Sequence, residues 1–219
     1  MAEAGRVVAG AARGIRLVAP GPGTRPLADR VKQPLFAILE PDLPGAVVLD
    51  LFAGSGAGGI EALSRGAARA VFVERDPGAA RTIAENLRRT GLAARGRVVR
   101  RDALAYLALD AADDGPFDVV LADPPYAETA LLAAALERLG VSSSDLLAPR
   151  ARVVAKHFWR DPPPARVGLL ASERERRFGE TALTFYRRDD TPATVERGTA
   201  TADEPDDGRA GRAGEEGAR

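Results

Sequence analysis

Short apolar runs alternate with helix-like segments over residues 45–188 of this 219-residue chain. The runs are Val-rich and nearly continuous, which is typical of parallel strands covered by helices on both faces. We expect strands at Ala46–Leu51, Ala70–Glu74, Gly96–Arg101, Phe117–Ala122 and Arg152–His157, and helices near Gly58–Arg65, Pro77–Thr90, Ala103–Asp110 and Thr129–Leu139. Arg166–Ser172 and Thr181–Arg187 have instead the pattern of a hairpin. The chain is therefore predicted to be α/β, with a Rossmann-like, doubly wound, mostly parallel seven-stranded sheet and a C-terminal antiparallel hairpin.

Composition divides the chain into three parts. Residues 1–44 are basic and rich in Gly and Pro, with a short helix expected at Asp29–Leu39 and Asp29 as its N-cap. Residues 45–188 form the α/β domain. Residues 189–219 contain one Val and no Leu, Ile, Phe, Trp or Tyr, so they cannot bury enough apolar area to offset their ordering entropy. We expect this last part to be a disordered acidic tail.

The formal net charge of zero hides a segregation of charge along the chain. The tail carries nine acids and four arginines, so residues 1–188 hold the compensating positive excess. The stretch from Arg6 to Lys32 alone has six basic side chains against Asp29. Such a basic arm favours a polyanionic partner.

Several protein classes are excluded or disfavoured by composition. The chain has no Cys, which excludes a disulfide framework and a thiol nucleophile, and its single His makes a histidine metal site unexpected. No apolar run approaches the length of a membrane span, and the first residues lack the apolar region of a signal peptide. We expect a cytoplasmic monomer that binds neither a metal nor a membrane.

A glycine loop follows the first strand of the α/β domain. Gly54-x-Gly56-x-x-Gly59 stands between a predicted strand and a predicted helix, the context in which such a loop binds a nucleotide. Glu74, at the end of the next strand, is placed to accept hydrogen bonds from ribose hydroxyls. These features alone leave a dinucleotide and a nucleoside-type cofactor both open.

Two further acids distinguish between a dinucleotide and a nucleoside-type cofactor. Asp50 precedes the glycine loop, where the charge of a pyrophosphate would be repelled and a cationic amino acid moiety would be favoured. Asp102 ends the third strand and could accept from an adenine amine. Acids after three successive strands suit S-adenosylmethionine better than NAD.

The fourth strand ends in Asp123-Pro124-Pro125-Tyr126. Two consecutive prolines make the turn rigid and remove two N–H donors, so Asp123 and nearby carbonyls remain as acceptors. A planar base could stack on Tyr126 while its amino group donates to Asp123. Acceptors of this kind can align an aryl amine for attack on a sulfonium methyl group.

Together these motifs resemble those of the class I S-adenosylmethionine-dependent amino-methyltransferases, and more narrowly the bacterial 16S (small-subunit) ribosomal RNA guanine-N2 methyltransferase family. The resemblance extends from Arg6 to Arg188. It includes Arg6-Val-Val-Ala-Gly10, Arg13-Gly14, Leu17, Arg25-Pro26, Asp29-Arg30-Val31, Leu49-Asp-Leu-Phe-Ala-Gly-Ser-Gly56, Glu61-Ala-Leu-Ser-Arg-Gly66 and Phe178-Gly-Glu-Thr181. The Asp-Pro-Pro-Tyr turn is typical of the amino-methyltransferase class as a whole. The N-terminal block, which consists of the motifs that begin at Arg6, indicates the guanine-N2 methyltransferase family within that class.

The resemblance implies a role for each matching residue. S-adenosylmethionine would be surrounded by Asp50, Phe52, Gly54, Gly56, Glu74 and Asp102. The guanine would be held by the catalytic residues Asp123, Pro124, Pro125 and Tyr126. The RNA, in 16S ribosomal RNA or an assembling small subunit, would contact Arg6, Arg13, Arg16, Arg25, Asp29 and Arg30, with Arg25, Asp29 and Arg30 at the mouth of the site.

The chain departs from the family pattern on the substrate side. Leu27 stands where the family usually has Thr, Lys32-Gln33 where it has Arg-Glu, and Lys156-His157 where an acid commonly ends the fifth strand. His157 is expected to have a structural or hydrogen-bonding role. Phe158 and Trp159 could offer stacking surface, although packing over the sheet edge is the favoured interpretation.

Two alternatives remain open. An adenine-N6 or other nucleobase amino-methyltransferase could use the same turn, because both amines present the same donors to Asp123. A non-catalytic RNA-binding module on a cofactor fold is disfavoured, because acids stand at all four strand ends.

Overall fold

The computed structural model describes residues 3–21, 29–125, 128–141 and 145–190. Among these residues, eight strands form the main sheet in the order β5-β4-β3-β6-β7-β10-β9-β8. The parallel strands are β3 (Val47–Asp50), β4 (Arg69–Val73), β5 (Gly96–Val99), β6 (Phe117–Ala122) and β7 (Leu147–Phe158). The antiparallel strands are β8 (Arg166–Val167), β9 (Leu170–Phe178) and β10 (Thr181–Arg188). This arrangement confirms the predicted doubly wound, mostly parallel sheet with antiparallel C-terminal strands.

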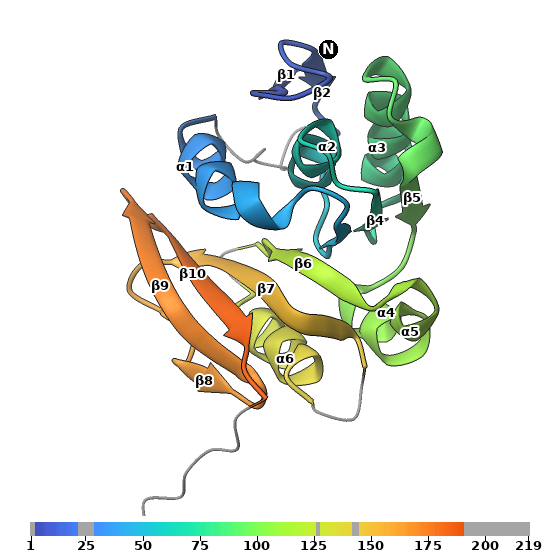
Figure 1. Cartoon of the computed structure of the whole chain (residues 1–219). Helices are drawn as coiled ribbons and strands as arrows, with labels where there is room; N and C mark the ends of the chain where they lie inside the picture. Colours follow the sequence, from blue (N-terminus) through green and yellow to red (C-terminus); the bar gives the residue numbers. More distant parts are fainter. Residues whose placement is uncertain (1–2, 22–28, 126–127, 142–144, 191–219) are drawn as a thin grey trace, which may run out of the picture.

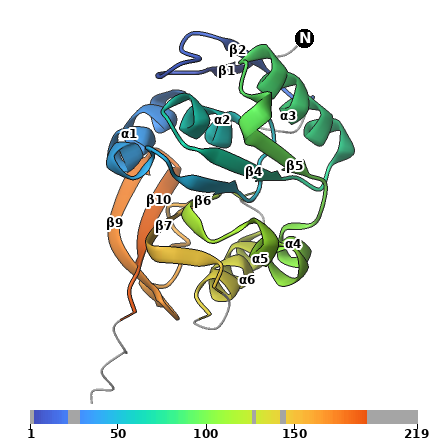
Figure 2. The same cartoon turned by 45° about the vertical axis from the view of Figure 1, so that its right-hand side comes forward.

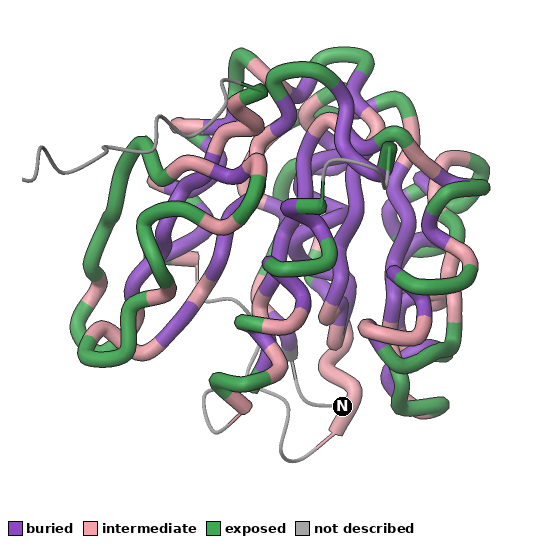
Figure 3. The backbone as a smooth tube through the Cα atoms, turned by 90° about the horizontal axis from the view of Figure 1, so that it is seen from below, coloured by how far each residue is buried: buried purple, intermediate pink, exposed green. Residues whose placement is uncertain are grey.

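Helices cover both faces of this sheet (Figures 1 and 2). One face packs against α1 (Asp29–Leu39), α2 (Ala57–Ser64) and α3 (Pro77–Arg89), and the other against α4 (Ala103–Leu109), α5 (Ala111–Asp114) and α6 (Thr129–Leu139). Short 3-10 turns, η1 (Glu40–Asp42) and η2 (Ala93–Arg95), complete the connections. The middle strands β3, β4 and β6 are almost wholly buried, and buried segments occupy the interior of the molecule (Figure 3), whereas the edge strand β5 has no buried residue.

Alternating side chains on each strand enter two separate cores. In β3, Val48 packs with the α1–α2–α3 layer, whereas Leu49 packs with the α4–α6 layer. Both side chains are fully buried. Because both faces of the strand are covered, its sequence is a continuous apolar run rather than an alternation of apolar and polar residues. Within the described residues, no helix has the length and apolar character needed to cross a bilayer.

The C-terminal strands differ from the prediction in extent. The predicted segment Arg166–Ser172 is two strands, β8 and the start of β9, separated by Gly168 at φ 55°. The hairpin partner of β10 is therefore β9, which continues to Phe178 and adds an eighth strand to the predicted seven. Residues 172–177 of β9 are exposed and mostly charged, so they lack the apolar signal by which the other strands were found.

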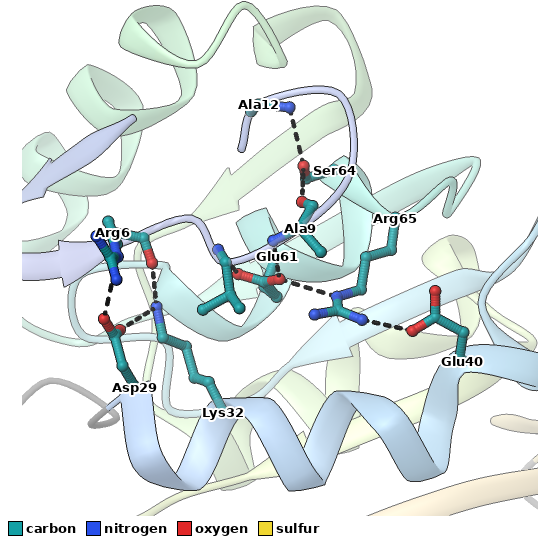
Figure 4. Close-up of polar contacts among 10 residues, drawn as sticks. Arg6, Ala9, Ala12, Asp29, Lys32, Glu40, Glu61, Ser64 and Arg65 are labelled. Atoms are coloured by element: carbon teal, nitrogen blue, oxygen red, sulfur yellow. Dashed lines mark hydrogen bonds and ion pairs between the residues drawn. The ribbon is translucent and has the colours of Figure 1, made fainter. Parts of the chain in front are cut away.

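The N-terminal arm forms a small sheet of its own, which the sequence did not predict. Its strands are β1 (Glu3–Arg6) and β2 (Arg16–Val18), paired antiparallel. The connecting loop docks on α2: buried Glu61 accepts hydrogen bonds from the backbone N–H groups of Val8 (2.7 Å) and Ala9 (3.0 Å). Ser64 binds Ala12 N–H at 2.9 Å and donates to the carbonyl of Ala9 at 2.5 Å (Figure 4).

Further polar contacts join the arm to α3 and α1. Asn86 of α3 accepts from Val18 N–H at 2.8 Å and donates to the Val18 carbonyl at 2.9 Å. Lys32 is fully buried in α1, pairs with Asp29 at 3.1 Å, and donates to the carbonyl of Arg6 (Figure 4). Asp29, predicted as the N-cap, is the first residue of α1, and its carboxylate contacts Lys32 and Arg6. Lys32, one of the six basic side chains counted in the arm, is therefore not available to a partner at the surface.

The first two residues of the predicted tail, Asp189 and Asp190, lie within the described residues. Asp189 donates its backbone N–H to Leu169 and pairs with Arg166 at 3.1 Å, and Asp190 pairs with Arg188 at 2.8 Å. These two acids thus contact the folded body. The remainder of the predicted tail, residues 191–219, lies outside the described residues.

Candidate active site

A cavity of about 510 Å³ opens at the carboxyl ends of β3, β4 and β6. This is where ligands bind in open α/β sheets. Its wall includes the predicted residues Asp50, Phe52, Gly54, Glu74, Asp102, Asp123, Pro124 and Pro125. The strand ends thus bring together residues that are up to 75 positions apart in the chain.

The glycine loop begins α2 beside this cavity. Gly56 precedes the helix at φ 78°, in the left-handed region where a side chain would be strained. Gly59 packs so closely on Phe72 that an added Cβ atom would lie 2.3 Å from its ring. The Asp50 carboxylate accepts from Gly59 N–H at 2.8 Å, so this acid holds the loop as well as facing the cavity.

Glu74 and Asp102 have structural contacts that the sequence did not reveal. Glu74 accepts from Gly54 N–H and from Asp76 N–H, both at 2.8 Å. Asp102 caps α4 by accepting from Leu104 N–H at 3.0 Å and Ala105 N–H at 3.1 Å. A carboxylate has about four acceptor positions. Both acids therefore hold the surrounding backbone while they retain capacity to accept hydrogen bonds from a ligand.

Burial changes the acidity of the carboxylates deepest in the site. Burial raises the pKa of Asp50 to about 7, Gly59 N–H opposes the shift, and the nearby charges of Asp123 and Glu74 reinforce it. The pKa of Asp123 is also raised by burial, although Lys156 acts in the opposite direction. The cavity thus concentrates negative charge that a cationic ligand would stabilise.

Asp123 forms an ion pair with Lys156, with 2.5 Å between Oδ1 and Nζ. The pairing follows from strand register: Ala122 of β6 lies opposite Ala155 of β7, so the next residues emerge side by side. Lys156 was noted from the sequence only as a departure from the family pattern. The adjacency of β6 and β7, which could have indicated the pair, is a property of the sheet order.

The remaining predicted residues are divided between the surface and the undescribed segments. Arg13, Arg16 and Arg30 are exposed, and Arg6 pairs with Asp29 at 3.7 Å. From α1 the cavity wall includes Leu35, whereas the Asp29 carboxylate is directed to Arg6 and Lys32. The place of Asp29 and Arg30 at the mouth of the site stays a prediction. Arg25 and Tyr126 lie outside the described residues.

His157 is buried and bonded on both ring nitrogens. Nδ1 lies 2.9 Å from the carbonyl oxygen of Phe158, and Nε2 lies 2.9 Å from Oγ1 of Thr184. The contact with Thr184 joins β7 to β10. Both contacts agree with the structural role expected from the sequence.

Four features together define the class of Rossmann-like methyltransferases. They are the doubly wound sheet, the glycine loop, the acidic cavity at the carboxyl edge of the sheet, and the Asp-Pro-Pro turn beside them. The family model described as Conserved hypothetical protein 95 matches residues 5–187. Ribosomal RNA small subunit methyltransferase D of Escherichia coli (strain K12) is 35% identical over 185 residues, covering 84% of this chain and 90% of that protein. The chain therefore belongs to the family described as Conserved hypothetical protein 95.

Solved structures agree with this assignment. The structure of yhhF from Escherichia coli has 34% sequence identity and a TM-score of 0.74, and the match covers 84% of this chain and 97% of that one. An RNA methyltransferase from Salinibacter ruber, solved in complex with S-adenosyl-L-homocysteine, is 18% identical with a TM-score of 0.56, over 75% of this chain and 94% of that one. This second likeness shows the shared fold.

Proposed function

We propose that this protein transfers a methyl group from S-adenosylmethionine to the exocyclic N2 of a guanine in 16S ribosomal RNA, acting as a monomer on the RNA or on an assembling small subunit. The coarser activity, S-adenosylmethionine-dependent methylation of ribosomal RNA, follows from membership of a family that includes the small-subunit methyltransferase D. Guanine N2 as the target rests on the motifs of the N-terminal block.

The cofactor is S-adenosylmethionine, and the residues of the cavity fit it. The glycine loop and the amino terminus of α2 allow close approach of backbone, and Asp50, Glu74 and Asp102 supply acceptors. The raised pKa of Asp50 favours a cation beside it. When bound, S-adenosylmethionine supplies an electrophilic methyl group on a positively charged sulfur.

The observation that carries the proposal is the position of Asp123 in the same cavity as the glycine loop. Oδ1 of Asp123 is held by Lys156, and we infer that Oδ2 accepts an N–H bond from the target amine. Pro124 and Pro125 hold this turn rigidly. The lone pair of an aryl amine is delocalised, and an acceptor on its N–H orients the nitrogen toward the methyl donor.

Proton removal needs no strong base in this proposal. The new N–C bond forms as the bond between sulfur and the methyl carbon breaks, so the nitrogen becomes cationic and S-adenosylhomocysteine leaves as a neutral thioether. The nitrogen then loses a proton readily. Asp123 and water can accept that proton, and Lys156 opposes the rise in the pKa of Asp123 that burial causes.

The test is methyl transfer to small-subunit RNA by Asp123→Asn. We expect affinity for S-adenosylmethionine within a few fold of the wild type, and a rate lower by about 10², because a positioned acceptor is lost. The control is Asp113→Asn, which changes an exposed acid on α5. Mass spectrometry of the product nucleosides should show N2-methylguanosine. N6-methyladenosine would favour the adenine alternative, and full activity of Asp123→Asn would place the site elsewhere.

The ion pair gives a second prediction. Lys156→Met removes the cation that lowers the pKa of Asp123, so that pKa should rise further. Because protonated Asp123 accepts poorly, the acid limb of the pH–rate profile should move to higher pH, with activity recovering at alkaline pH. Lys156→Arg keeps the charge and should retain the original profile. Identical profiles for all three proteins would show that Lys156 does not govern Asp123.

A further inference from the structure

A second cavity, of about 340 Å³, adjoins the candidate active site. It shares Pro124, Pro125, Glu128 and Lys156 with the larger cavity, so the Asp-Pro-Pro turn separates the two. Its other walls come from α6 and from the chain that follows β7, including Phe158 and Pro162–Pro164. The proposed transfer reaction gives this second cavity no role.

A cation–aromatic cluster of Trp159, Arg160 and Arg177 adjoins the lining of the second cavity, because Trp159 and Arg160 stand in the chain between the lining residues Phe158 and Asp161. The guanidinium carbon of Arg177 lies 3.5 Å from the centre of the Trp159 ring, and that of Arg160 lies 4.9 Å from it. The Trp159 ring is 6.3 Å from that of Phe158, which lines the cavity. Arg160 and Arg177 are both exposed to solvent.

Strand register explains why these side chains meet. Ala182 of β10 lies opposite both His157 of β7 and Arg177 of β9, so the three share one face of the sheet. Trp159, two residues beyond His157, continues on that face. Arg177 also donates Nε–H to the carbonyl of Gly179 at 2.9 Å, which orients its guanidinium.

The exposed charges beside the cavity favour an anion there. Arg160 and Arg177 are exposed cations, whereas Lys156 in the wall is already paired with Asp123 at 2.5 Å. Of the two acids in the wall, Glu128 is paired with Arg75 at 2.8 Å, and Asp161 is exposed. Guanidinium groups held in place suit phosphate, and walls of proline and phenylalanine suit the face of a base.

We propose that the second cavity binds the nucleotide adjacent to the target base, with Arg160 and Arg177 on its phosphates. The proposal rests on the proposed function, since a base held at Asp123 places its neighbour beside Pro124 and Pro125. This site would let the protein recognise the RNA on the far side of the turn from the methyl donor.

Trp159 provides a direct readout, because it is the single Trp of the chain. Adding a short single-stranded RNA oligonucleotide to the full-length protein should change its fluorescence, with the same midpoint as RNA binding measured by anisotropy of labelled RNA. The double variant Arg160→Gln/Arg177→Gln should bind RNA about tenfold more weakly and reduce the salt slope by about 1.5 to 2, as expected for two lost phosphate contacts. Its affinity for S-adenosylmethionine should not change.

Two further variants separate the cavity from general charge. Ala133→Phe, at an exposed position of α6 in the cavity wall, should weaken RNA binding and leave cofactor binding intact. Arg138→Gln/Arg150→Gln removes two exposed arginines outside both cavity walls and should have little effect.

Wild-type RNA affinity in both the Arg160/Arg177 and the Ala133 variants, with methyl transfer intact, would overturn this inference alone. Absence of both RNA binding and methyl transfer in the wild type would overturn the proposed function and this inference together.

Discussion

At the scale of single residues, the site is a group of carboxylates whose first task is structural. Asp50 binds Gly59, Glu74 binds Gly54, and Asp102 caps α4. The same side chains face the cavity, so the groups that shape the loop also set its electrostatic potential. A substitution at one of these acids should therefore affect stability as well as ligand binding.

Asp50 gives a prediction for pH dependence. Its pKa is raised to about 7, so the carboxyl is protonated below that pH and ionised above it. A cationic ligand binds the ionised form better, and binding must therefore release a proton near pH 6. Affinity for S-adenosylmethionine should rise with pH, by at most about tenfold per unit below pH 7.

Calorimetry in buffers of different ionisation enthalpy measures this proton release. The ligand has titrating groups of its own, so the readout is the difference between wild type and Asp50→Asn, which should lack the Asp50 contribution. Equal proton release by the two proteins would contradict the role assigned to Asp50.

At the scale of elements, α2 has two functions that the sequence motif did not separate. Its amino terminus borders the cavity, whereas its last turn holds the N-terminal arm through Glu61 and Ser64. Arg65 pairs with Glu61 at 2.8 Å and with Glu40 at 2.5 Å, which joins the arm, α2 and η1 in one network (Figure 4). The Glu61-Ala-Leu-Ser-Arg-Gly66 motif thus binds the N-terminal arm to α2.

Glu61→Gln tests this docking. The amide keeps one acceptor oxygen and presents an NH2 group in place of the other, so one of the backbone N–H groups of Val8 and Ala9 loses its acceptor. We expect a loss of about 1–3 kcal/mol in the free energy of unfolding, measured with denaturant. Hydrogen exchange at Val8 and Ala9 should also become faster.

The matched control is Glu85→Gln, which breaks an exposed pair with Arg88 and should cost less than about 1 kcal/mol. Equal losses in the two variants would argue against a special role for Glu61.

At the scale of the whole molecule, charge is distributed by position in the fold. Arg13 and Arg16 remain exposed on the docked arm, whereas Lys32 is buried and neutralised by Asp29. The arm therefore presents fewer cations than its sequence suggests, on a rigid support. We propose that these arginines contact RNA phosphates away from the cavity.

Arg13→Gln/Arg16→Gln should weaken RNA binding and reduce its salt slope by about 1.5 to 2, while cofactor affinity stays unchanged. Filter binding of small-subunit RNA over a range of salt concentrations measures both quantities. Arg138→Gln/Arg150→Gln is again the control for loss of two exposed charges. A slope unchanged relative to this control would exclude the arm from the RNA interface.

The sequence by itself determined the order of elements and the residues that stand at the strand ends. β6 and α6 were predicted with the bounds that the structure has, because hydrophobic periodicity is a local property of the chain. Asp50, Glu74, Asp102 and Asp123 were placed correctly because parallel strands end at one edge of the sheet.

Tertiary structure alone decided which of these side chains became partners. The Asp123–Lys156 pair depends on β6 and β7 being neighbours, and the contacts of Glu61 depend on the arm folding back onto α2. The exposed residues 173–177 of β9 were missed because backbone pairing to β10, rather than their own apolar pattern, holds them in the sheet. Such pairings join residues far apart in the chain, and the burial that makes each polar partner obligatory exists only once the chain has folded.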